Sequence, residues 1–195
     1  GEIDELALPF AMRSDRVPGK ADELCDGRFE LVGLPAVRFE EIDWQRRPAD
    51  DLLWTFTLHY FEWGLELAEA WRATGREAYA QRVLEAIDAW IAANPVGAEP
   101  GWHSYPTSRR LVAWCKILAA TREAPGWAST ARRALASMAE QAMYLADWPE
   151  YHLAGNHLLA NFHALAWVHR HVGGLLGDGV CERLAPFVGR FEEEL

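Results

Sequence analysis

The feature that most constrains the fold is a helical periodicity that begins near residue 50 and continues along the rest of the chain. In the segment DDLLWTFTLHYFEWGLELAEAWRATG, apolar residues recur at every third or fourth position, as an amphipathic helix requires. Asp50 and Asp51 are candidate N-terminal caps and Gly75 is a candidate end. The pattern predicts one helix over about residues 50–74.

Five further helices follow from the same periodicity. The first of them ends at Pro95, because proline inside a helix removes a hydrogen bond and clashes with the preceding turn. The succession of helices, with no convincing strand after residue 50, predicts an all-α domain of consecutive antiparallel helices, as in α-solenoids and α/α toroids. The five helices are expected at about residues 76–94, 106–122, 129–148, 157–171 and 180–195.

The first 49 residues lack this pattern. We expect residues 1–49 to form an irregular segment packed on the helical domain, with one or two short extended pieces in RFELVGLPAVRFEEIDW. The helical domain then covers residues 50–195. Its last predicted helix is still in progress at Leu195, so we expect the domain to continue further.

Charge and composition exclude several classes of partner and cofactor. The formal net charge of -10 and the absence of a basic run argue against binding to nucleic acid or to an anionic membrane. No apolar stretch approaches the length of about 20 residues that spans a bilayer. Three widely spaced cysteines indicate neither a disulfide framework nor a thiolate metal site. Ten tryptophans suit either aromatic walls for sugar rings or the packing of helices.

Five of the seven histidines lie in EYHLAGNHLLANFHALAWVHRH. Their spacings do not place two imidazoles on one helical face, so we predict no metal site and no cofactor, and interpret His163, His169 and His171 as structural. Asn156 and His157 differ because they follow Gly155 at the start of a helix, where unpaired N–H groups favour an anion. The alternative is that Asn156 only caps the helix.

Two other segments combine aromatic and polar side chains. PGWHSYPTSRRLVAW contains Trp102, His103, Tyr105 and Arg109, and LWTFTLHYFEW contains His59 and Tyr60. Arginine can bind a carboxylate or sulfate through two hydrogen bonds, and tryptophan or tyrosine can stack on a sugar. The alternatives are an ion pair between the arginine and an acidic side chain, and a tryptophan that fills a helix junction.

Together, these three segments resemble the N-terminal helical domain of the heparinase II/III family of polysaccharide lyases, which are related to the alginate lyases. The resemblance covers roughly residues 27–195. It implies an incomplete α/α toroid, followed in full-length members by an antiparallel β-sandwich domain that is absent from this chain. It also implies an anionic polysaccharide or oligosaccharide as the partner, and a periplasmic or secreted location if the protein is like the family's degradative members.

The resemblance assigns roles to individual residues. The asparagine of the family's GNH motif, which neutralises the uronate carboxylate during β-elimination, maps onto Asn156, and His157 binds the same carboxylate or moves a proton. From its position shortly before this motif, we also expect Glu150 to orient His157, to cap the loop or to contact substrate. The family's catalytic tyrosine and a further histidine have no counterpart here, so we expect the 195-residue chain alone to be inactive. The expected substrate-binding residues are His59, Tyr60, Trp102, His103, Tyr105, Arg109 and Glu150.

The sequence is also compatible with two other functions. A glycoside hydrolase on a similar helical toroid needs two carboxylic acids beside the scissile bond, and Glu62, Glu99 and Glu150 are the candidates. A noncatalytic carbohydrate-binding scaffold needs no tyrosine at all.

Overall fold

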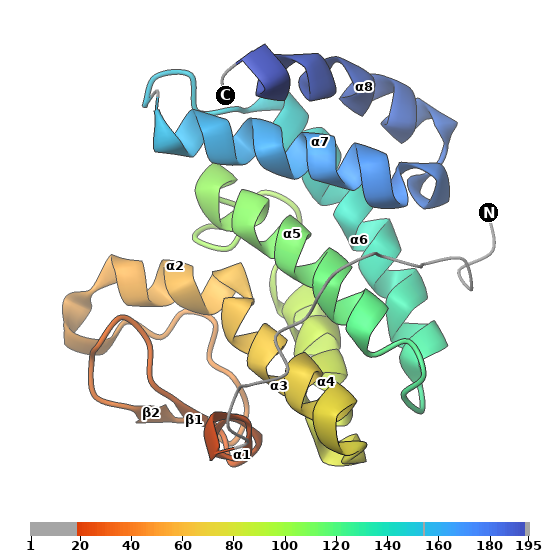
Figure 1. The fold of residues 1–195 in the computed structure, drawn as a ribbon. Coiled ribbons are helices and arrows are strands. Elements are labelled where there is room, and N and C mark those ends of the chain that lie inside the picture. Colours follow the sequence, from red (N-terminus) through yellow and green to blue (C-terminus); the bar gives the residue numbers. More distant parts are fainter. Residues whose placement is uncertain (1–18, 154, 194–195) are drawn as a thin grey trace.

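Helices dominate the part of the chain that the structure, a computed structural model, describes: residues 19–153 and 155–193 (Figure 1). A 3-10 turn lies at Pro48–Asp50, and β1 (Arg28–Phe29) pairs antiparallel with β2 (Val37–Arg38). The prediction of an all-α fold is confirmed. The α-helices are α1 (Gly19–Cys25), α2 (Leu52–Tyr60), α3 (Glu62–Thr74), α4 (Glu77–Ala93), α5 (Ser104–Ala120), α6 (Trp127–Asp147), α7 (Asn156–Leu176) and α8 (Asp178–Glu193).

The prediction of one continuous helix over residues 50–74 is wrong, because Phe61 separates α2 from α3. Its backbone lies in the left-handed region, at φ 60° and ψ 12°, which is uncommon for a residue with a side chain. Its ring is fully buried and stacks on Trp44 and Trp63, with centroids 5.4 Å and 5.2 Å away, and meets Trp114 edge-on. This aromatic packing stabilises the break.

The other predicted helices are present, with shifted ends. α5 begins two residues before Pro106, which its first turn tolerates because the N–H groups there have no intrahelical partner. α7 continues through Gly173 and Gly174 to Leu176. The two short strands agree with the expected extended pieces, whereas α1 lies in a stretch that was expected to be irregular. Residues 1–18 of that stretch lie outside the described residues, and the boundary at residue 49 stays a prediction.

The helices after α2 pack as two alternating layers. α5 contacts both α3 and α7, while α6 contacts both α4 and α8. Consecutive helices from α3 to α8 are also in contact, α4 and α5 through the rings of Trp90 and Trp114, and Figure 1 shows α5 lying between α3 and α7. This alternation is the arrangement expected of an α/α toroid, whose closure into a ring stays a prediction. Among the described residues, no helix has the length and hydropathy needed to cross a bilayer.

The layer formed by α3, α5 and α7 brings the starts of α5 and α7 together. Helix α3 packs closely on the later part of α5, because a Cβ added at Gly64 would lie 2.9 Å from side-chain atoms of Ile117 and Val83. Tyr60, just before α3, lies against Tyr105 in the first turn of α5, with ring centroids 5.7 Å apart. Tyr105 in turn lies 4.4 Å from the ring of His157 in the first turn of α7. The site described next lies at this end of the layer.

Candidate active site

Asn156 is the first residue of α7, and Gly155 is the N-cap. Gly155 has φ 61° and ψ -133°, a conformation that residues with a side chain rarely adopt, so a glycine is needed to start the helix in this direction. Because Gly155 occupies the N-cap position, Asn156 does not cap the helix. Its amide is exposed at a helix N-terminus, where the partial positive charge favours an anion.

Glu150 lies in the loop before α7 and is buried, with 3% of its surface exposed. Asn161, one turn into α7 and fully buried, holds it from two sides: Asn161 Oδ1 accepts from the Glu150 backbone N–H (2.8 Å), and Asn161 Nδ2 lies 3.3 Å from Glu150 Oε2. The same Nδ2 donates to Ser108 Oγ of α5 at 2.7 Å. The loop carboxylate is therefore fixed between α5 and α7.

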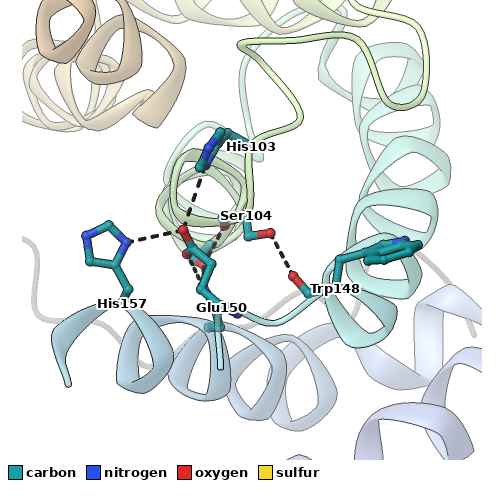
Figure 2. A network of polar contacts seen from close by, with 7 residues as sticks. His103, Ser104, Trp148, Glu150 and His157 are labelled. Carbon is teal, nitrogen blue, oxygen red and sulfur yellow. Dashed lines mark hydrogen bonds and ion pairs between the residues drawn. The ribbon is translucent and has the colours of Figure 1, made fainter. Parts of the chain in front are cut away.

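The other carboxylate oxygen of Glu150 faces two histidines, as Figure 2 shows. His157 Nδ1 lies 3.2 Å from Oε1, and His103 Nδ1 lies 3.8 Å from the same atom. When Nδ1 of His157 donates to Glu150, Nε2 of the neutral ring carries no proton and accepts one. A hydrogen bond from Ser104 Oγ to the Trp148 carbonyl (2.7 Å) ties the same loop to the start of α5.

Tyr105 lies against the ring of His157, and Tyr60 lies close to both Tyr105 and Arg109. Burial, followed by the nearby Tyr105, raises the pKa of Tyr60 to about 12, so its phenol remains a hydrogen-bond donor. Arg109 donates from Nε to Glu62 Oε1 at 2.7 Å and forms an ion pair with that carboxylate. The acidic partner considered for Arg109 is therefore present, although the arginine side chain remains exposed.

His59 and Trp102 lie in the core, which contradicts a direct contact with substrate. Trp102 is 1% exposed and donates its indole N–H to the Asn94 carbonyl (3.0 Å). His59 is fully buried, with Nε2 bonded to the Trp44 carbonyl and Nδ1 accepting from Trp90 Nε1, both at 2.9 Å. Burial, together with the nearby Arg110, lowers the pKa of His59 to about 3. Neither ring presents a surface to a polysaccharide.

Arg110 supports the site from inside the core. It is fully buried and donates to the side chain of Gln141 and to the backbone carbonyls of Gly101 and His59, at 2.9, 2.8 and 3.3 Å. Its guanidinium also lies over the Trp90 ring, 3.9 Å from the centroid. Burial lowers the pKa of Arg110. These bonds connect the start of α5 to α2, to α6 and to the loop before α5.

Two residues of this region were not anticipated from the sequence. Asn161 sits in an apolar stretch of helix, and that was a usable signal because a buried amide needs partners. Trp148 is 66% exposed and is the only one of the ten tryptophans, all within the described residues, whose side chain is exposed. No sequence signal distinguished Trp148 from the nine others.

The histidines interpreted as structural make local contacts. His163 packs between Trp167 and Phe191, and His169 Nδ1 lies 3.1 Å from the Cys181 carbonyl. Over residues 19–153 and 155–193, no group of three or more histidine, cysteine or acidic side chains is arranged to hold a metal ion.

Comparison with known proteins agrees with this architecture. Residues 34–169 match a family model described as Heparinase II/III N-terminus. The chain is 31% identical over 134 residues to a heparin-sulfate lyase of Bacteroides thetaiotaomicron, a match that covers 64% of this chain and 18% of that protein.

Solved structures show the same fold. The heparan sulfate lyase HepC of Pedobacter heparinus superposes with a TM-score of 0.74 at 21% identity, over 87% of this chain and 28% of that one. A heparinase III superposes with a TM-score of 0.80 at 17% identity, over 99% of this chain and 32% of that one. The chain thus spans a minor part of each relative, and it belongs to the heparinase II/III family, whose N-terminal region it matches.

Proposed function

We propose that the protein containing this chain is a polysaccharide lyase that cleaves uronic-acid glycans by β-elimination. The chain would supply the part of the active site that binds the uronate carboxylate. The observation that carries the proposal is the buried Glu150, which fixes His157 beside the exposed amide of Asn156 at the start of α7. Relatives named as heparin-sulfate and heparan sulfate lyases support the choice of reaction and substrate class.

The difficulty of the reaction explains why an amide is needed. The proton on C5 of a uronate is weakly acidic, because its removal adds negative charge next to a carboxylate that is already ionised. Hydrogen bonds from the Asn156 side chain, aided by the N-terminal N–H groups of α7, would neutralise that carboxylate and stabilise the enolate-like transition state. The C5–H electrons then form the C4–C5 double bond as the C4–O bond breaks, and the leaving oxygen takes up a proton.

His157 would bind the same carboxylate or transfer a proton through Nε2, because Nδ1 is directed at Glu150. Glu150 would act as a positioning residue, since its buried carboxylate is already bonded to His157 and Asn161. Oriented side chains of this kind reduce the reorganisation that the reaction requires.

Substrate contacts would come from side chains around this pair. His103, Tyr105 and Arg109 are at least partly exposed beside His157, and Tyr60 supports Tyr105. Trp148 would take the stacking role that Trp102 cannot. Because Figure 2 shows its indole directed away from the Glu150 carboxylate, it would stack on a sugar other than the one that reacts.

The remaining chemistry would come from outside this chain, which covers 18% of its curated relative. The family resemblance assigns a tyrosine to proton exchange with C5 and the leaving oxygen, and none of the tyrosines here matches its motif. We therefore expect the 195-residue chain alone to give no turnover.

The test is an assay of the full-length gene product on heparan sulfate, hyaluronan and alginate. A lyase generates the ultraviolet absorbance of a C4–C5 unsaturated uronate, and Asn156→Ala should reduce that signal by about a hundredfold or more. His152→Gln, an exposed change in the same loop, is the control and should be silent. New reducing ends without the absorbance would indicate a hydrolase, and either that result or full activity of Asn156→Ala would overturn the proposal.

A further inference from the structure

A cavity of about 160 Å³ lies between α3, α5 and α7, next to the candidate active site. This volume is well above what one water molecule needs, so a small anionic group fits inside. Its lining includes Glu62, Ser108, Arg109, Lys116, Ala160 and His163.

The helical repeat places this cavity in line with His157. Positions three or four apart share one face of a helix, so on α7 Ala160, which lines the cavity, lies one turn after His157. On α5 the opposing face runs from Tyr105 through Arg109, and Lys116 lines the cavity further along. Tyr105 contacts His157 at one end of this pair of faces, and Ala160 is too small to close the space that follows. The cavity is therefore a continuation of the active-site surface.

The lining carries more positive than negative charge, in contrast to a chain with a net charge of -10. Arg109 and Lys116 contribute two cations, and Glu62 contributes one carboxylate. Arg109 donates from Nε and Nη2 to a single oxygen of Glu62. Because a guanidinium has five N–H donors, these two bonds do not use all of its capacity. The pKa of His163 is lowered by burial and then by Lys116 and Arg109, as expected where two cations act on one place.

We propose that this cavity binds an anionic substituent, a sulfate or a carboxylate, on a sugar adjacent to the one that is cleaved. Arg109 and Lys116 would hold the anion, and Glu62 would hold Arg109 in place until it binds. The inference rests on the proposed function for its substrate class, and it adds a second anion site along α5 and α7 to the one at Asn156.

The test measures binding, so it does not depend on turnover. The probes are a heparan sulfate hexasaccharide and a heparosan hexasaccharide, which lacks sulfate and keeps the carboxylates, each titrated into the full-length gene product by calorimetry. Replacing both cations (Arg109→Gln with Lys116→Gln) should weaken binding by about tenfold or more, because charge-assisted hydrogen bonds are lost. The control pair is Arg122→Gln with Arg132→Gln, which line a hollow elsewhere, beside the start of α6, and should change little.

A variant that should strengthen binding distinguishes the loss of an anion contact from damage to the fold. Glu62→Gln removes the competing carboxylate and should tighten binding by a few-fold, which a damaged fold would not do. Loss confined to the sulfated probe identifies a sulfate site, and loss with both probes identifies a carboxylate site. Unchanged affinity in the double variant, or no binding by the wild type, overturns the inference. A wild type that binds but yields no unsaturated product would instead contradict the proposed function alone.

Discussion

His59 should make the stability of this protein depend on pH between about 5 and 7. Its Nδ1 accepts a hydrogen from Trp90 and its Nε2 donates to the Trp44 carbonyl, so the buried ring is held in one neutral tautomer. A second proton would have to enter at Nδ1, facing the Trp90 N–H and close to Arg110. This geometry, with burial, accounts for a pKa of about 3 against an ordinary 6.5.

The direction and size of this pH dependence follow from the linkage between proton binding and folding. The folded-state pKa lies below the unfolded value, so the unfolded chain binds more protons in acid, and stability is lost as the pH falls below 6.5 towards 3. Between about pH 7.5 and pH 5 this one ring should remove roughly 2 kcal/mol from the free energy of unfolding, at about 1.4 kcal/mol for each pH unit below the unfolded pKa.

Urea denaturation of the wild type and of His59→Gln at these two pH values measures the effect. Glutamine supplies an N–H and a carbonyl oxygen but does not titrate, so the variant should lack about 2 kcal/mol of the pH-dependent loss. His152→Gln, an exposed change, should keep the wild-type dependence. If His59→Gln lost as much stability in acid as the wild type, the neutral tautomer inferred for His59 would be refuted.

Three further predictions concern residues around the site. Glu150→Gln should lower kcat by about tenfold or more with little change in KM, because it disturbs the orientation of His157 rather than a substrate contact. An altered KM alone would contradict this. Trp148→Ala should weaken oligosaccharide binding about threefold to tenfold in a calorimetric titration and leave the unfolding free energy within about 0.5 kcal/mol. Trp102→Ala should instead lower the unfolding free energy by about 3 kcal/mol or more in a denaturation experiment, and the reverse pattern would contradict both roles. Arg110→Ala should cost about 3 kcal/mol or more, because it leaves buried carbonyls without donors, and a near-neutral denaturation curve would contradict that.

Periodicity alone predicted most of the helices, because each one needs an apolar face and α3, α4, α6 and α7 end just before a glycine or proline. The break at Phe61 was beyond the reach of local patterns, since Trp44 and Trp114, from distant parts of the sequence, pack with the neighbouring Trp63 against its ring. The same limit applies to Trp102, whose burial depends on how α4, α5 and α6 pack.

The candidate site was predictable to a similar extent. The roles given to Asn156 and His157 remain predictions, although the start of α7 was placed within one residue. That Glu150 lies within hydrogen-bonding distance of His157 follows from Asn161, a residue whose partners only the folded chain reveals. Sequence identifies residues able to do chemistry, whereas exposure and orientation decide which of them can reach a ligand.

The meeting of the starts of α5 and α7 at one end of their layer has a kinetic consequence. The chain as a whole is strongly negative, so a polyanion approaching from a distance is repelled, while the two helix N-termini attract it only close to their first turns. Added salt screens the far repulsion first, because the Debye length is about 10 Å at 0.1 M, and it weakens the short-range contacts less. The association rate of such a ligand should therefore rise with moderate salt, whereas salt slows the association of a basic protein with a polyanion. The dissociation rate should rise as well.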